Sequence, residues 1–518
     1  MTRTKTAVVI GTGAGGLTAA AYLAKAGVKV IALEQAREPG GFLNPFVRRR
    51  YHFDPGVHYV GECAPGQAIH NVLKPLDIDA GQLFTELDPE GFDVYRFPDH
   101  ELRFCKGMDR YRDRLAAAFP RRKKAVDRFY KKISAVGRAI SAQERLSDGH
   151  VAQAAVMALQ NLYPLLRWAF VPYESFLNTI TDDPQLRAVL CAQLGDLGLA
   201  PSKVSAIYAM GLMLHYSTGA YFPRGGSGSL RDALVEATTT HDGIFHTRCA
   251  AVNIQMKGKR ALAVETEDGQ RFEADAVISA IEPQHTFTRL MNPGDLPPVL
   301  RWKVQRSKAS PGTFCIFLGM KRDISKHGMG RCNIWDYPHY DIENLMTPAD
   351  PDPKTGAVRP TGFFLSPNSL KDDSGAMAPK GASTLEIVTM MPYGPFKHWD
   401  NMESYKRGPD YEAFKTNVGE ALLQQVEQRY PGLVGNVEVR EFASPVTNSY
   451  WVNAVQGGAY GPAALPSQVG PLRCMPVTGF DNLFLAGSGT FGGGVSPCLA
   501  SGRVAAKAAL RHLKIKDK

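Results

Sequence analysis

The chain of 518 residues is long enough for two or three domains, and its composition, 44% hydrophobic and 21% charged, is that of an ordinary globular protein. The formal net charge of +10 at pH 7 suits an anionic ligand or an anionic membrane. The sequence contains neither a zinc-finger spacing nor an aromatic RNA-binding stretch, so we expect no nucleic-acid partner.

The eight cysteines are scattered along the chain and form no CxxC pair. This pattern predicts free thiols in a reducing compartment, with neither a disulfide framework nor a metal site. No stretch reaches the eighteen uninterrupted apolar residues of a membrane-spanning helix. We therefore expect a cytoplasmic protein, or one attached to the cytoplasmic face of a membrane.

The first motif is a glycine-rich turn, GTGAGG, at residues 11–16. The β-forming run TAVVI, 6–10, leads into it, and an alanine-rich helix and a second β-forming run, VKVIALE at 28–34, follow. A complete βαβ unit of about thirty residues is the context in which such a turn binds a dinucleotide.

Individual residues of this unit have physical roles. Gly11 allows the tight turn, Gly13 lets the backbone approach a pyrophosphate, and Gly16 lets the helix pack against the strand. The N-terminus of the helix offers N–H groups and a positive dipole to the phosphates. Glu34 is placed to accept hydrogen bonds from a ribose hydroxyl.

A second glycine pattern, GSGTFGGG, occupies residues 487–494. The strand-like NLFLAG leads into it, and the helix-like SPCLASGRVAAKAALRHL runs from it nearly to Lys518. We expect no second strand and no acidic residue after this helix, so the pattern is not a full dinucleotide unit. A helix N-terminus needs no second strand to face a phosphate.

Further segments carry a family resemblance. The first motif is followed by a glycine pair, Gly40 and Gly41, by FDPGVH at 53–58, and later by GAYFPRGGSGSLRDAL at 219–234. Together with both glycine patterns, these segments resemble the flavoprotein family of phytoene desaturases, carotenoid isomerases and retinol saturases. SPVTNSYWVNAVQGGAYGP, 444–462, is most similar to the retinol saturases.

The resemblance implies FAD as the cofactor, with one nucleotide contacted from both ends of the chain. No nicotinamide-binding domain is visible in the sequence, so we expect electrons to come from an unidentified partner. The residues expected to contact FAD are Gly11, Gly13, Ala14, Gly15, Gly16, Glu34, Gln35, Gly40, Gly41, Asp54, Gly56, Val57, His58, Val252, Gly487, Ser488, Gly494 and Val495.

The predicted fold class is α/β, with a discontinuous Rossmann-type FAD-binding domain and an inserted mixed substrate domain. A helical insert at about 115–180 belongs to the substrate domain. The predicted FAD-binding domain comprises 1–85, 215–290 and 440–518, and the predicted substrate domain comprises 86–214 and 291–439.

The helical insert admits two interpretations. A basic stretch, 121–138, precedes an apolar segment that contains Tyr163, Trp168, Phe170 and Tyr173. A basic flank beside an apolar and aromatic helix favours attachment to a membrane surface. The same pattern fits a core helix beside a solvated basic helix, because the two are alike in sequence.

The resemblance implies an FAD-dependent oxidoreductase that acts on carbon–carbon double bonds of a long apolar polyene of the carotenoid or retinoid type. Saturation, desaturation and isomerisation all stay open. His58 is the candidate to relay a proton, with Tyr460 and His215 as weaker candidates. The alternative for His58 is a histidine that bonds the backbone of its own turn.

Two other functions fit the same sequence features. A flavin amine oxidase would share the fold but would need an aromatic cage and reoxidation by oxygen. A non-enzymatic flavin-bearing lipid carrier would need neither. A redox change of the bound flavin with a polyene distinguishes the polyene enzyme from both.

Overall fold

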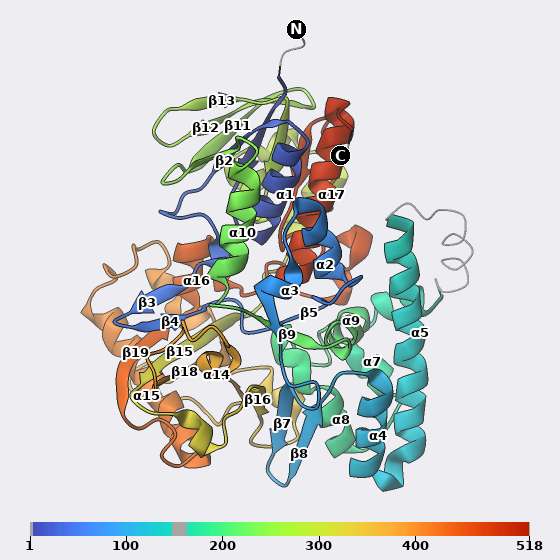
Figure 1. Ribbon diagram of the computed structural model, residues 1–518, viewed down its shortest axis with the longest axis vertical. Coiled ribbons are helices and arrows are strands. Elements are labelled where there is room, and N and C mark those ends of the chain that lie inside the picture. The colour runs from blue at the N-terminus through green and yellow to red at the C-terminus, as the bar shows by residue number, and fades with distance from the viewer. Residues whose placement is uncertain (1–3, 148–162, 517–518) are drawn as a thin grey trace.

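The computed structural model describes residues 4–147 and 163–516. Its upper part in Figure 1 holds the glycine turns and the helices that follow them, its lower left holds a large sheet, and its lower right holds the helical insert. This arrangement confirms the predicted α/β class.

The upper part is built on a parallel sheet. Its strands follow the order β10–β2–β1–β14–β20, and every neighbouring pair is parallel. Parallel sheets are covered on both faces, which explains the uninterrupted apolar runs in the sequence. The strands are β1 (Thr6–Ile10), β2 (Lys29–Leu33), β10 (Ile244–His246), β14 (Ala276–Ser279) and β20 (Leu483–Leu485).

Alternate residues of β1 belong to two different cores. Ala7 and Val9 pack with the helices on one face, whereas Val8 and Ile10 pack with a small antiparallel sheet on the other. The helices on the first face are α1 (Ala14–Lys25), α2 (Ala68–Leu73), α3 (Ala80–Leu83), α10 (Gly228–Thr239) and α17 (Val495–Leu513). The small sheet consists of β11 (Ala251–Lys257), β12 (Arg260–Thr266) and β13 (Arg271–Glu273).

A mixed sheet of seven strands forms the lower part, and only its β16–β7 pair is parallel. On β18, Leu385 and Ile387 join the core beneath α15, so Glu386 and Val388 project from the opposite face. In spatial order the strands are β19 (Val437–Ala443), β15 (Gly312–Met320), β18 (Ser383–Met391), β17 (Phe363–Ser366), β16 (Asn333–Asp336), β7 (Asp93–Phe97) and β8 (His100–Phe104).

Short strands and helices join the two parts. β3 (Phe46–Arg48) pairs with β4 (Tyr51–Phe53), and β9 (Ala220–Pro223) lies between β5 (Val60–Gly61) and β6 (Phe84–Glu86). The remaining helices outside the insert are α11 (Pro283–Arg289), α12 (Pro298–Arg306), α13 (Ile342–Leu345), α14 (Asn368–Lys371), α15 (Pro409–Arg429) and α16 (Pro445–Val452).

Two of the predicted domain boundaries can be compared with these elements. The boundary at 440 lies inside β19, a strand of the seven-stranded sheet. Leu300 and Val304 of α12, beyond the predicted boundary at 290, pack in the core beneath the parallel sheet.

The described residues of the helical insert include both buried and exposed aromatic side chains. Trp168 and Tyr173 agree with the core interpretation, because they are buried: Trp168 packs edge-on against Phe176 with ring centroids 5.0 Å apart, and Tyr173 stacks on the same ring. Tyr163 and Phe170 are exposed. The rest of the predicted apolar segment, up to residue 162, lies outside the described residues. The helices are α4 (Met108–Ala118), α5 (Lys123–Ser147), α7 (Tyr173–Leu177), α8 (Pro184–Leu190) and α9 (Ala206–Ser217).

No helix within the described residues combines the length and the apolar character that crossing a membrane requires. All eight cysteines are free thiols, and seven of them are buried.

A testable consequence concerns the contact between α1 and α17. A Cβ atom added at Gly502 would overlap the backbone oxygen of Gly15, which cannot move without displacing α1. We expect Gly502→Ala to lower the free energy of unfolding by about 1–3 kcal/mol, as overpacking does elsewhere. Denaturant titration of the FAD-loaded protein measures the change.

The matched control is Gly211→Ala, in the interior of α9, where an added Cβ meets nothing within 4 Å. That substitution should be neutral or raise stability by about 0.5–1 kcal/mol, because alanine is the better helix former. Equal effects of the two substitutions would contradict the close-packing argument.

Candidate cofactor and active site

The two glycine turns meet at a single cavity of about 520 Å³. A Cβ atom on Gly15 would lie 2.5 Å from the backbone nitrogen of Gly487, so the turns are in direct contact. The first residues of α1 and α17 line this cavity beside the turns. Both glycine patterns, nearly the whole chain apart in sequence, therefore serve one site.

The start of each helix fits a phosphate group. Gly13 and Gly494 precede the first turns of α1 and α17, and neither helix has a side-chain cap. The first N–H groups of a helix lack partners within the helix and carry positive partial charge. A Cβ atom on Gly13 would meet nothing within 4 Å, so a ligand has room to approach this backbone. The residues present thus fit the pyrophosphate of FAD.

Glu34 closes the neighbouring part of the cavity at the end of β2. Its side chain is buried and one oxygen, Oε2, accepts hydrogen bonds from Thr12 N (3.1 Å) and Thr12 Oγ1 (2.5 Å). The other oxygen, Oε1, accepts the N–H of Ala36 at 2.9 Å. An ionised carboxylate has about four acceptor positions, so Glu34 keeps capacity for a ribose hydroxyl.

Most of the predicted cofactor residues line this cavity, and Gly16, Gly40 and Asp54 lie behind it. A Cβ atom on Gly16 would overlap the oxygen of Gly11, which agrees with a packing role. Gly40 donates its N–H to Thr12 Oγ1 at 3.3 Å. The predicted residues in the lining are Gly11, Gly13, Ala14, Gly15, Glu34, Gln35, Gly41, Gly56, Val57, His58, Val252, Gly487, Ser488, Gly494, Val495 and Tyr460.

A smaller chamber of about 60 Å³ adjoins the cavity beside the seven-stranded sheet. His58, Val388 and Tyr460 line both spaces, so they form the boundary between them. The other side chains of the chamber are mainly aromatic or thioether groups. They include Trp335, Tyr337, Leu345, Met346, Phe363, Phe364 and Met390.

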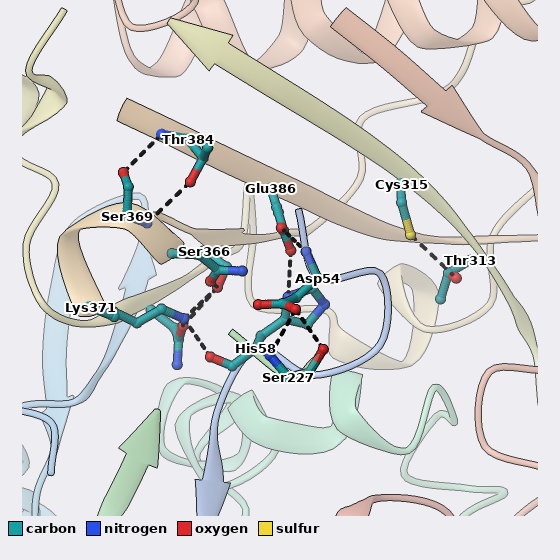
Figure 2. Close-up of polar contacts among 12 residues, drawn as sticks. Asp54, His58, Ser227, Thr313, Cys315, Ser366, Ser369, Lys371, Thr384 and Glu386 are labelled. Carbon is teal, nitrogen blue, oxygen red and sulfur yellow. Dashed lines mark hydrogen bonds and ion pairs between the residues drawn. The ribbon is translucent and has the colours of Figure 1, made fainter. Parts of the chain in front are cut away.

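A buried polar network holds His58 in place (Figure 2). His58 Nδ1 lies 2.9 Å from Glu386 Oε2, and Glu386 Oε1 accepts the N–H of Asp54 at 2.8 Å. Asp54 Oδ1 in turn accepts hydrogen bonds from the backbone and the hydroxyl of Ser227 at the start of α10. Asp54 therefore fixes the turn that carries His58.

Lys371 holds the backbone of His58 from the other side. Its ammonium donates to the His58 oxygen at 2.5 Å, to Asn333 Oδ1 at 2.7 Å and to Ser366 Oγ at 2.6 Å. Figure 2 shows Lys371 and Ser366 beside the His58 segment, opposite Glu386 and Asp54. Elements of both parts of the molecule thus converge on one turn.

Burial shifts the protonation of this network toward uncharged forms. Burial raises the pKa of Glu386 to about 8 and, helped by the Glu386 charge, that of Asp54 to about 7. Burial and the positive charge of Lys371 lower the pKa of His58 to about 3, and burial lowers the pKa of Lys371 to about 7. His58 is consequently a neutral imidazole at physiological pH.

His215, the weaker histidine candidate, lies in neither lining. Its Nδ1 is 2.8 Å from Glu62 Oε2 and its Nε2 accepts the N–H of Gly61 at 2.9 Å, so the ring supports β5.

The sequence interpretation missed Glu386 and Lys371. A single acidic residue inside the otherwise uncharged strand STLEIVTMM is the signal that marks Glu386.

Comparison with known proteins identifies relatives along nearly the whole chain. Over 526 residues the chain is 27% identical to an all-trans-retinol 13,14-reductase of Danio rerio, covering 96% of this chain and 85% of the relative. It is 26% identical to a chloroplastic prolycopene isomerase of an Oncidium hybrid cultivar (99% and 85% covered). A 4,4'-diapophytoene desaturase of a Methylomonas species is 23% identical (98% and 95% covered). These relatives confirm the resemblance drawn from the motifs.

Among solved structures, an oxidoreductase from Methanosarcina mazei superposes with a TM-score of 0.65 at 15% identity, covering 97% of this chain and all of the other. A putrescine oxidase variant superposes with a TM-score of 0.64 at 15% identity over 99% and 100%. At this identity the likeness establishes the fold alone.

The family model described as flavin containing amine oxidoreductase matches residues 14–510. The chain therefore belongs to the flavin containing amine oxidoreductase family and is an FAD-dependent oxidoreductase.

Proposed function

We propose that one FAD is held by the residues of both glycine turns. Glu34 would accept the adenosine ribose hydroxyls, with Val252 beside the adenine, and the N-termini of α1 and α17 would face the pyrophosphate and the flavin end. The direct contact between Gly15 and Gly487 supports a single nucleotide, because it joins the two turns into one binding surface.

We expect Glu34→Ala to weaken FAD binding by about 1–3 kcal/mol, through loss of hydrogen bonds to a charged group. Apoprotein titrated with FAD measures the change. Glu38→Ala is the matched control, because the Glu38 carboxylate is exposed and lies 3.6 Å from Arg231. A denatured extract should contain one FAD per chain, and two nucleotides per chain would overturn the single-site proposal.

We infer that the substrate is a long apolar polyene, of the carotenoid or retinoid type. The chamber next to His58 has a mainly apolar and aromatic lining, which suits such a chain. Its lining, within the described part of the chain, holds one carboxyl group, Asp196, whose pKa is raised to about 8 by burial and by the charge of Asp93. A neutral acid offers little attraction to the ammonium group of an amine.

The chamber has room for a short part of a polyene only. Met346 and Met390 lie in its wall, and methionine side chains adapt readily to the shape of a ligand. A longer substrate would extend from the chamber past His58 and Tyr460 into the larger cavity. The reacting carbon atoms would then lie at the boundary that these two residues form.

Bound FAD supplies hydride transfer to or from carbon. The protein orients the chain of the substrate, excludes water from it and holds a neutral histidine beside it. Relatives that are retinol reductases favour saturation as the direction of the reaction. The electron partner stays a prediction, as does the cytoplasmic location.

The central experiment uses photoreduced enzyme without oxygen. We expect an all-trans retinoid or carotenoid to reoxidise the bound flavin, while the absorbance of the polyene shifts to shorter wavelength as one double bond is lost. A shift to longer wavelength with oxidised enzyme would show desaturation, and an unchanged bond count with new geometry would show isomerisation.

Two outcomes of the same experiment would replace the proposal. Reduction of the flavin by a primary amine, with no response to any polyene, would establish an amine oxidase. Tight binding of a polyene without any redox change of the flavin would establish a lipid carrier.

We further propose that the helical insert contacts an anionic membrane. Tyr163, Leu166 and Phe170 follow helical spacing, and their exposed fractions are 72%, 57% and 44%. Arg167 and Lys132 flank this stripe, since both cations lie over the ring of Trp168. Apolar and aromatic side chains rimmed by basic residues favour the interface of an anionic bilayer.

We expect the protein to partition onto phosphatidylglycerol vesicles, less at high salt but still measurably. Leu166→Ser should weaken this partition by about 1–2 kcal/mol, through loss of buried apolar area. Val477→Ser is the matched control, because Val477 is also 57% exposed but lies elsewhere on the surface. A protein that stays in the supernatant at low salt would refute the membrane proposal.

A further inference from the structure

One buried carboxyl group beside the active site has no role in the function described so far. Glu386 has no exposed surface and stands between the apolar residues Leu385 and Ile387 in β18. Apart from the 2.9 Å approach to each other, Glu386 Oε2 and His58 Nδ1 have no hydrogen-bond partner within the described residues. The side-chain amide of Asn368 also interacts with the Glu386 carboxyl group.

The contact between Glu386 Oε2 and His58 Nδ1 needs a proton between the two atoms, because a carboxylate oxygen and an unprotonated ring nitrogen only accept hydrogen bonds. Burial favours the neutral acid and the neutral imidazole, since it raises the pKa of Glu386 and lowers that of His58. In this state the proton of Glu386 can reach Nδ1 across the 2.9 Å approach. A neutral imidazole that accepts at Nδ1 carries its own hydrogen on Nε2.

The hydrogen on Nε2 is available to the substrate. Nδ1 is completely covered, whereas the side chain of His58 is 17% exposed and lines both the cavity and the chamber. The accessible edge of the ring is thus the edge away from Glu386. Glu386, the ring of His58 and the apolar chamber therefore lie next to one another in this order.

We propose that Glu386 supplies, through His58, the proton that enters the substrate when a double bond is reduced. The inference rests on the proposed polyene reduction. Saturation breaks one π bond and forms two C–H bonds, one with a hydride that carries the two electrons of reduced FAD and one with a proton. His58 gives the Nε2 proton to carbon and receives the proton of Glu386 at Nδ1, so the ring stays neutral.

The carboxylate left on Glu386 is stabilised where it forms. The N–H of Asp54 already donates to its Oε1 at 2.8 Å, and the charge of Lys371 favours the ionised form. A proton from solvent later restores the acid. Glu386 acts through His58 and does not touch the substrate.

The pH dependence follows from the groups that face Glu386. These are Asp54 after β4, His58, Lys371 of α14 and Cys315 of β15. Glu386 loses its proton as pH rises through its pKa of about 8, so the rate should fall above pH 8. Asp54 and Lys371 titrate near pH 7, and their titrations should persist at lower pH when Glu386 is replaced, because the Glu386 charge raises the pKa of both groups.

The test is Glu386→Gln in the FAD-loaded enzyme. Glutamine keeps the acceptor for Asp54 and a donor for His58 Nδ1 but has no proton to release. We expect polyene reduction by the photoreduced variant to slow about a hundredfold. The fall in rate above pH 8 should disappear, while FAD content and photoreduction stay as in the unmodified enzyme.

An infrared spectrum supplies a readout independent of turnover. The unmodified resting enzyme should show carbonyl absorption of buried protonated carboxylic acids, shifted in D₂O, and one component of it should be lost in Glu386→Gln while the contributions of Asp196 and Asp54 remain. The matched control is Glu282→Gln, because Glu282 is a half-buried acid of the cavity that accepts the N–H of Val455 and does not contact His58. That variant should keep the fall in rate above pH 8.

The possible outcomes are distinct. If the unmodified enzyme reduces polyenes and Glu386→Gln does so equally fast with the same alkaline fall, the relay is wrong and the proposed function stands. If no polyene reoxidises the unmodified enzyme, the proposed function fails and the relay fails with it. If the variant does not fold, absence of the acid band from the unmodified enzyme overturns the relay alone.

Discussion

The close approach of Gly15 to Gly487 is the constraint on which the rest of the site depends. Any side chain at Gly15 would separate the two turns, and with them the N-termini of α1 and α17. Gly502 extends the same close packing one turn deeper, against the backbone of Gly15. Two helix N-termini brought together in this way concentrate unpaired N–H groups in one place, so the site can attract a pyrophosphate through backbone groups alone.

This close packing explains why the nucleotide-binding part is discontinuous. The parallel sheet needs β20 beside β14, and α17 must return across α1 to cover it. The strands of the seven-stranded sheet therefore come from chain that lies between strands of the parallel sheet, and Val388 of that sheet joins His58 and Tyr460 at the boundary of the two spaces.

Burying the side chains of Asp54, Glu386 and Lys371 lowers the free energy of unfolding. Removing charged groups from water carries a penalty of several kcal/mol per ion, and well-packed apolar residues are often at least as stable. Neutral forms reduce this penalty, which is the direction in which burial shifts the pKa values of all three groups. Stability alone gives no reason for a buried acid in β18, whose other residues are all uncharged, whereas proton transfer does.

The fold shared with amine-oxidising enzymes leaves the chemistry open, because function is decided by side chains at the site. Here those side chains are a neutral histidine, a tyrosine and an apolar aromatic chamber whose single acid is held uncharged. An apolar substrate meets no unpaired charge in such a chamber. The same walls would leave an ammonium group without a counter-ion.

The sequence alone determined the features that depend on local spacing. The first glycine turn, its βαβ unit and Glu34 follow from residues close together in the chain, where turn geometry and strand period dictate the structure. The family motifs likewise identified the cofactor.

Tertiary structure decided which distant residues meet. Glu386 reaches His58 across 328 positions of sequence, and only the pairing of β18 within the seven-stranded sheet orients it there. The aromatic residues of the insert show the same limit, because Trp168 is buried and Phe170 is exposed although both suit either environment. Burial is a property of packing, which a local pattern of side chains leaves open.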